Sequence, residues 1–168
     1  MISAIVYSSQ TGHTRQYAKL LSDELSLPWY DLSKGVPAPK GREIIYMGWL
    51  FAGKIKGYEK AANENRVKAV CAVGMGPESD GLIGRLYEDN KISADVPVFY
   101  MQGGFDMKAL PLPMRAIMSL KNKSIAADLL KVGTMNAQQT ATFRMTQGKY
   151  SAVSKENLAP VADWYRSL

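Results

Sequence analysis

The stretch that decides the fold is Ile5-Val6-Tyr7-Ser8-Ser9-Gln10-Thr11-Gly12-His13-Thr14, close to the start of the chain. It begins within an apolar run over residues 2–7, which is typical of a buried β-strand, and ends in a cluster of Ser, Thr and Gly residues. A helical pattern follows, with four apolar residues on one face: Tyr17, Ala18, Leu21 and Leu25. A loop between a strand and a helix presents backbone N–H groups, hydroxyls and the positive end of the helix dipole at one point. The stretch therefore predicts a binding site for a phosphate group.

Two common nucleotide-binding motifs are absent from this loop. It has neither the Gly-x-Gly-x-x-Gly pattern of dinucleotide-binding folds nor the Gly-Lys-Ser/Thr sequence of P-loop NTPases. Without a lysine placed to contact a γ-phosphate, the sequence does not support ATP hydrolysis.

Further apolar strands and helical stretches follow the opening unit. Strands are expected at residues 29–32, 43–48, 67–73 and 96–101, and helices at residues 56–65, 79–90 and 154–168. Each of the last three strands is apolar along its length, as strands covered on both faces are. We therefore expect an α/β protein with a doubly wound parallel sheet. The segment 34–42 is rich in Pro and Gly, so a helix between the second and third strands is expected to be absent or very short.

Length and composition are those of one globular domain over residues 1–168. The chain has 168 residues, 46% of them apolar and 21% charged, which is too apolar for a disordered chain. No apolar stretch approaches the ~20 residues of a membrane helix, and the first residues lack the basic region of a signal peptide, so we expect a cytoplasmic protein. One Cys and one His cannot form a structural zinc site, and Cys71, inside an apolar strand, is expected to be a buried, unreactive thiol.

The positive charge is concentrated toward the C-terminal side. Residues 105–168 carry 9 Lys and Arg against 4 Asp and Glu, within a net charge of +6 for the chain. Residues 107–150 are basic and rich in Met, and we expect an amphipathic helix or helix pair there, followed by an extended loop over residues 136–149. Its apolar stripe either packs in the core or forms an adaptable surface for an anionic partner or a lipid surface: Leu110, Met114, Ile117, Met118, Ile125 and Leu129. A basic surface can also serve solubility alone, and nucleic acid is the least favoured partner because clustered aromatic residues are lacking.

The opening loop resembles that of the flavodoxin family. The residues that match the family pattern are Ile5, Val6, Tyr7, Ser9, Gly12, Thr14, Ala18 and Leu21. The resemblance extends more weakly over the whole chain. It implies a five-stranded parallel sheet of order 2-1-3-4-5 and a tightly bound FMN, with its phosphate at the loop formed by Ser9, Gln10, Thr11, Gly12, His13 and Thr14. His13 is expected either to contribute a minor contact or to be exposed to solvent.

Two further loops would hold the flavin ring in such a fold. They contain Gly48, Trp49, Leu50, Phe51, Ala52 and Gly53 after the third strand, and Gly74, Met75, Gly76 and Pro77 after the fourth. Trp49 and Phe51 are the candidate ring contacts, with burial in the core as the alternative. Gly48 and Gly53 either let the backbone approach the flavin or serve as turn glycines. Many flavodoxins place an aromatic residue in the second loop, whereas residues 74–79 contain none, so one ring face is expected to be open to a substrate.

Two segments are similar to the subgroup of flavodoxin-domain proteins that includes bacterial flavin-dependent protoporphyrinogen oxidase. They are residues 99–106 and the segment 49–54. The similarity implies a quinone or a protoporphyrinogen as a possible class of substrate.

We therefore expect an FMN-binding redox protein that transfers electrons through the flavin, without a catalytic side chain. It would act either as an electron carrier for a redox partner protein or as an oxidoreductase for a small organic acceptor. Flavodoxin carriers are usually acidic, and this chain is basic. The alternative is a binding module that keeps the fold and uses its basic segment to dock an anionic partner or a membrane surface.

Overall fold

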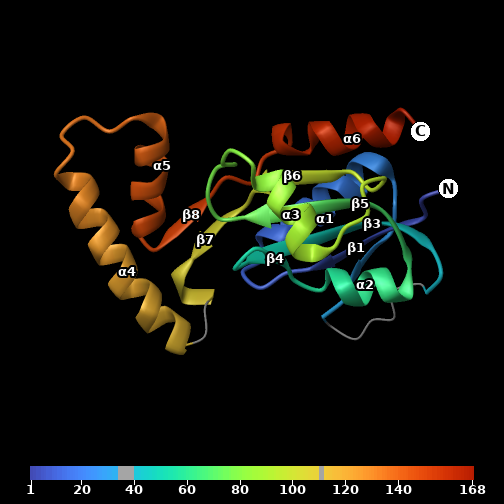
Figure 1. Ribbon diagram of the computed structural model, residues 1–168, viewed down its shortest axis with the longest axis horizontal. Coiled ribbons are helices and arrows are strands. Elements are labelled where there is room, and N and C mark those ends of the chain that lie inside the picture. The colour runs from blue at the N-terminus through green and yellow to red at the C-terminus, as the bar shows by residue number, and fades with distance from the viewer. Residues whose placement is uncertain (34–39, 110–111) are drawn as a thin grey trace.

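A parallel β-sheet forms the centre of the molecule, and helices cover both of its faces (Figure 1). The structure, a computed structural model, describes residues 1–33, 40–109 and 112–168. The sheet contains β1 (Ala4–Ser8), β2 (Trp29–Asp31), β3 (Glu43–Phe51), β4 (Lys54–Ile55), β5 (Arg66–Gly74) and β6 (Val98–Gln102). The helices around it are α1 (His13–Leu25), α2 (Tyr58–Glu64), α3 (Leu82–Asn90) and α6 (Ala159–Arg166), which the 3-10 turn η2 (Glu156–Leu158) precedes. The predicted α/β class with a parallel sheet flanked by helices is confirmed.

The strands lie in the order β2-β1-β3-β5-β6, and all neighbours in this series are parallel. β4 is antiparallel to the end of β3, through the pairs Leu50 with Ile55 and Phe51 with Lys54. β3 therefore runs three residues beyond the expected strand, because Trp49 still pairs with β5 and β4 supplies partners for Leu50 and Phe51.

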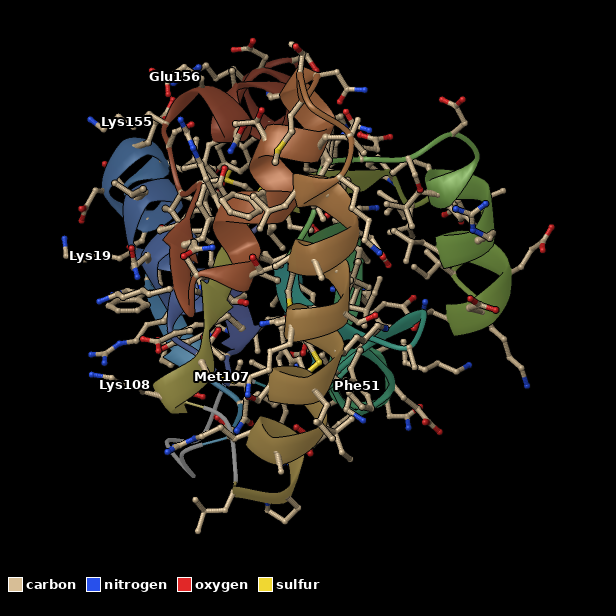
Figure 2. All side chains as sticks on the ribbon, turned by 90° about the vertical axis from the view of Figure 1, so that its left-hand side faces the viewer. Lys19, Phe51, Met107, Lys108, Lys155 and Glu156 are labelled. Atoms are coloured by element: carbon tan, nitrogen blue, oxygen red, sulfur yellow. The ribbon has the colours of Figure 1, made fainter. Side chains whose placement is uncertain are left out.

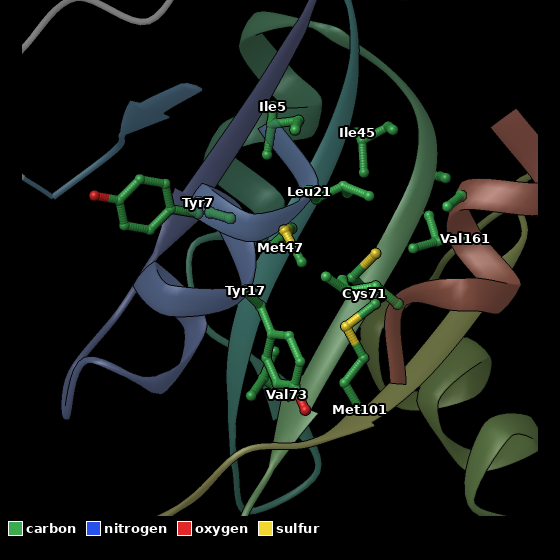
Figure 3. Packing of buried hydrophobic residues seen from close by; sticks show 14 of the residues in the cluster. Ile5, Tyr7, Tyr17, Leu21, Ile45, Met47, Cys71, Val73, Met101 and Val161 are labelled. Carbon is green, nitrogen blue, oxygen red and sulfur yellow. The ribbon is translucent and has the colours of Figure 1, made fainter. Parts of the chain in front are cut away.

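Side chains alternate between two cores, one on each side of the sheet. Ile5, Ile45 and Cys71 point to the face covered by α1 and α6, where Leu21 and Val161 pack on them (Figure 3). Their neighbours along the strands point the other way, onto α2 and α3: Val6, Tyr46, Val70 and Ala72 pack with Ala61 and Leu86. This period of two explains why the central strands are apolar throughout, since both faces are covered.

An arm extends from one end of the sheet (Figure 1). It comprises β7 (Gly104–Asp106), the 3-10 turn η1 (Met107–Ala109), α4 (Leu112–Leu130), α5 (Ala137–Thr146) and β8 (Lys149–Ser151). β7 and β8 pair antiparallel as a separate two-stranded sheet, and α4 packs against α5. We call residues 104–151 the arm. The chain therefore leaves and re-enters the main body through the same short ribbon.

The prediction of an extended loop at residues 136–149 is wrong, because most of this segment forms the helix α5. The helix begins at a capping box, in which the Asn136 side chain accepts from the Gln139 N–H at 2.8 Å and the Gln139 side chain accepts from the Asn136 N–H at 2.9 Å. Asn followed by Gln three residues later was the available sequence signal. The helix itself is polar and weakly periodic, so its hydrophobic pattern did not indicate it.

The short strands β4, β7 and β8 were not predicted, because two or three residues carry no detectable period. The expected absence of a helix at 34–42 falls mainly on residues 34–39, which lie outside the described residues. No helix in the described parts of the chain is both long and apolar enough to cross a membrane.

Candidate functional site

Three connections at the carboxyl ends of the parallel strands meet around one cavity. They are the β1–α1 loop, the β3–β4 hairpin and the start of the β5–α3 loop. The cavity has a volume of about 90 Å³, and its walls are mostly apolar. It is lined by Gln10, Thr11, His13, Thr14, Trp49, Leu50, Phe51, Val73, Gly74, Met75, Gly104 and Met118. This end of the sheet is where open α/β folds bind their ligands.

The β1–α1 loop is tightened by one hydroxyl. The Ser9 Oγ accepts hydrogen bonds from the Gly12 N–H at 3.2 Å and from the Arg15 N–H at 3.3 Å. Gly12 is the N-cap of α1 and has a φ of 92°, a left-handed conformation that glycine adopts without strain. Thr14, in the first turn of α1, is buried. The loop thus gathers a hydroxyl-rich turn at the positive end of the α1 dipole.

His13 is buried between this loop and the root of the arm. Its Nδ1 lies 2.9 Å from the Thr11 hydroxyl. On its other side it packs on Gly104, where a Cβ would come within 2.8 Å of the His13 Nε2 and 2.2 Å of the Tyr150 carbonyl oxygen. Burial lowers the pKa of His13, and Lys149 lowers it too, while Asp106 and the Tyr150 backbone raise it. The exposed position that the sequence left open is therefore wrong, while a minor contact with a ligand stays a prediction. His13 joins the candidate site to the β7–β8 ribbon.

The β3–β4 hairpin presents two aromatic side chains to the cavity. Its two-residue turn, Ala52 and Gly53, has φ values of 49° and 78°, as a type I′ hairpin turn requires. The Trp49 and Phe51 rings lie 5.9 Å apart between centroids, at 54° to each other. Phe51 is 47% exposed, and the Lys56 ammonium lies 5.8 Å from its ring centroid. Neither ring is buried in the core.

Two side chains hold the β3–β4 hairpin and the β5–α3 loop in place. Asn90, at the end of α3, accepts from the Ile55 N–H at 2.8 Å and donates to the Gly53 carbonyl at 3.0 Å, which anchors the hairpin. The Tyr100 hydroxyl donates to the Gly76 carbonyl, and burial raises the pKa of Tyr100 to about 12. The phenol therefore remains a donor across the physiological pH range.

Most of the residues predicted from the sequence come together here, but six do not line the cavity. Ser9, Gly12, Gly48, Ala52, Gly53 and Gly76 shape the backbone beside it. At Gly48, a Cβ would come within 2.5 Å of the Ile55 side chain and 2.9 Å of the Lys56 carbonyl oxygen, so this glycine allows the hairpin to fold back. Gly53 is therefore a turn glycine, whereas Gly48 lies within β3 and is explained by this close packing.

Sequence reasoning missed three lining residues: Val73, Gly104 and Met118. Met118 was placed in an apolar stripe whose members do not share one environment, because Ile117 is 66% exposed. Leu110 lies outside the described residues, as does the side chain of Met114. The helical spacing in α4 gave no indication of which face turns toward the cavity. Figure 2 shows α4 crossing in front of the body, with Phe51 beside it in this view.

Comparison of the chain with protein-family models, with curated proteins and with solved structures finds no match. The function therefore has to be inferred from the site itself. The arrangement combines an anion-binding type of loop with an apolar cavity that has aromatic walls. The chemistry of these lining groups is of the kind that binds a phosphate beside an aromatic ring.

Proposed function

We propose that this chain is an FMN-binding redox protein of flavodoxin-like fold, which transfers electrons through the flavin as a carrier or as an oxidoreductase. One observation carries the proposal: the hydroxyl-rich loop at the N-terminus of α1 and the aromatic β3–β4 hairpin line the same cavity. A loop of the first kind suits a phosphate, and the Trp49 and Phe51 rings suit an isoalloxazine.

The topology of the sheet supports the proposal. When β4 is left out as an antiparallel addition, β2-β1-β3-β5-β6 corresponds to the strand order 2-1-3-4-5. The cavity lies beyond the ends of β1, β3 and β5, and β1 and β3 flank the point where the strand order reverses.

The residues present fit the chemistry of FMN, but the ring needs more room. The loop of residues 9–14 would hold the phosphate through backbone N–H groups and the Thr14 hydroxyl. A cavity of about 90 Å³ is smaller than the ~300–1,000 Å³ of pockets that bury a ligand of this class. Met118 is the lining residue contributed by α4, so binding of the ring would require α4 to shift outward.

Bound FMN would supply one-electron and two-electron chemistry. The side chains of the chain would bind, orient and shield it. Trp49 and Phe51 would form an apolar wall that excludes water, while Met75, a lining residue that is 41% exposed, leaves the cavity accessible on the side of the β5–α3 loop. That accessible side would admit either an organic acceptor, of the quinone or protoporphyrinogen type, or the surface of a redox partner protein. No side chain is needed to make or break a bond.

The first test is the chromophore of the purified protein. We expect a yellow protein that releases one FMN per chain, identified by its absorption spectrum and mass. A colourless protein that does not bind added FMN would refute the proposal and favour a binding module. If FMN is bound, rapid reoxidation by a quinone would support an oxidoreductase, and slow reoxidation by small acceptors would support a carrier.

The second test addresses the phosphate loop. We expect Thr11→Ala and Thr14→Ala each to weaken FMN binding by about 1–3 kcal/mol, because a charged acceptor loses a donor or the loop loses its support at His13. Thr134→Ala, at an exposed position between α4 and α5, is the matched control and should leave the dissociation constant unchanged. Unchanged affinity in both loop variants would exclude a phosphate at this loop.

A further inference from the structure

The net positive charge of the chain is carried by residues 107–150, which make up most of the arm. This segment contains 7 Lys and Arg and 1 acidic residue, Asp128, whereas the rest of the chain has 14 basic and 14 acidic residues. The excess in the segment therefore equals the net charge of +6 of the whole protein. The rest of the chain is neutral overall, so the positive field of the molecule originates from one projecting element.

The same element carries most of the exposed apolar side chains. Large hydrophobic residues on α4 and just after it are between 49 and 75% exposed: Leu112, Ile117, Leu120, Leu130 and Val132. They account for five of the nine exposed large hydrophobic residues in the described part of the chain. Contiguous exposed apolar surface on a soluble protein usually marks a docking site.

The four of these residues that belong to α4 lie on one half of the helix. Leu112, Ala116, Leu120, Lys123, Ala127 and Leu130 follow one another at spacings of three or four and are exposed. The opposite half of the helix faces inward. There Met118 lines the cavity and Asn122 is buried. We call the exposed half, with the flanking Ile117 and Lys121, the outer face of α4.

We propose that the outer face of α4 docks on the surface of an anionic lipid bilayer. The apolar residues would insert at the level of the headgroups, and the Lys121 and Lys123 ammonium groups would reach the lipid phosphates beside them. The proposal goes beyond flavin binding and does not rest on it, because the outer face of α4 lies on the side of the helix away from the cavity.

The distribution of charge favours lipid over a second copy of the chain. A two-fold dimer through this face would bring two surfaces of the same sign together, because both copies contribute the same patch. Residues 107–150 contain only one acidic residue with which to offset that repulsion. An anionic bilayer, in contrast, attracts the exposed Lys121 and Lys123 of this face.

The shape of the arm favours peripheral docking. α4 has 19 residues and is therefore about 28 Å long, and it lies at the edge of the molecule (Figure 1). Lysines within its outer face prevent it from crossing a bilayer, and this exposed face can lie flat on one. Because Met118 lines the cavity from the inner side of the same helix, docking would hold the cavity within about 10 Å, one helix diameter, of the headgroups.

The test is flotation of the full-length protein with vesicles. We expect binding to vesicles of phosphatidylcholine with one quarter phosphatidylglycerol, and at least tenfold weaker binding to vesicles of phosphatidylcholine alone. Raising the salt from 0.05 to 0.5 M should release most of the bound protein, because the attraction of the lysines is screened. The flavin content of the sample is recorded separately, so a protein that stays colourless with added FMN but binds vesicles would refute the proposed function and leave this inference intact.

Two pairs of variants decide whether the outer face is responsible. Lys121→Gln with Lys123→Gln should weaken binding about 30-fold, at ~1 kcal/mol per lysine, and Ile117→Ser with Leu120→Ser should weaken it about tenfold. The matched controls, Lys60→Gln with Lys91→Gln in the main body and Leu168→Ser at the C-terminus, should bind as the original protein does. All of these positions are exposed, so the variants are expected to fold.

Three results would overturn the proposal. One is the absence of binding to the anionic vesicles, which would point to a protein as the occupant of this face. Another is an equal loss of vesicle binding in the arm variants and in the control variants. The third is a dimer in solution that Ile117→Ser with Leu120→Ser dissociates, because the second copy would then occupy the outer face.

Discussion

Tyr17→Phe should measurably destabilise the protein, because this hydroxyl ties α1 to segments that are distant along the chain. The side chain is fully buried, and its hydroxyl donates to the Gln102 carbonyl at 2.6 Å. It also accepts from the Asn157 side-chain N–H at 2.7 Å, and the same amide nitrogen donates to the Ala152 carbonyl at 2.9 Å. The cluster therefore joins the helix after the candidate phosphate loop to the end of β6 and to the chain after β8.

The size of the effect follows from these contacts. Loss of the hydroxyl leaves the Gln102 carbonyl without this donor, which costs about 1–3 kcal/mol for a buried group. The Asn157 amide keeps its bond to Ala152, so its loss is smaller. We expect a decrease of about 2 kcal/mol in the free energy of unfolding, equivalent to a decrease of ~4–8 °C in Tm for a chain of this length.

The assay is urea unfolding of Tyr17→Phe, Asn157→Ala and the double variant. Because the two side chains share a hydrogen bond, we expect the double variant to lose less than the sum of the single variants, by about 1 kcal/mol. Tyr165→Phe, on the partly buried surface of α6, serves as a control for the removal of a phenol oxygen. A decrease below about 0.5 kcal/mol in Tyr17→Phe, or strict additivity, would show that this reasoning about the cluster is wrong.

Three further predictions concern other parts of the molecule. Because burial lowers the pKa of His13 below its usual 6.5, the unfolded chain binds the proton more readily, so the free energy of unfolding should fall as the pH drops from 7.5 to 5.5. His13→Gln should reduce this pH dependence, which urea unfolding at each pH would measure. An unchanged pH dependence would show that His13 does not cause it. Gly48→Ala should destabilise by about 1–3 kcal/mol, since its Cβ would meet Ile55 and the Lys56 carbonyl, whereas Gly84→Ala, in α3 with open space around it, should stabilise by about 0.5–1 kcal/mol. Thermal unfolding measures both changes in stability, and two changes of the same sign would contradict this prediction. Cys71 is fully buried, and burial raises its pKa, so a thiol reagent should label it only in denaturant; fast labelling of the native protein would contradict its place in the core.

The main sheet was predictable because its residues have a strong pattern. β1, β3 and β5 are apolar over most of their length, and strands of this kind are covered on both faces. The helix after β1 was predictable from the spacing of Tyr17, Ala18 and Leu21, all of which are buried. Because a parallel sheet is packed on both sides, such apolar segments are predicted as its buried strands and covering helices.

The candidate site was predictable only in part. The loop of residues 9–14 is contiguous in the sequence, so its hydroxyls and glycine form a pattern that can be recognised locally. Met118 and Gly104 reach the cavity from the arm, which is distant from this loop along the chain, and no local pattern links them to it. The role of His13 as a contact between that loop and the β7–β8 ribbon depends on the same long-range arrangement.

By itself, the sequence determined the fold class, the position of the hydroxyl-rich loop and the basic character of residues 107–150, because each is a property of neighbouring residues. The tertiary structure alone decided that three connections close around one cavity, that α5 is a helix and that α4 turns Met118 inward and Leu120 outward. The physical reason is that helix α4 is apolar on both halves, so its pattern could not select a buried face. The β7–β8 pairing and the packing of α5 fix its rotation, and these contacts form only when the chain has folded.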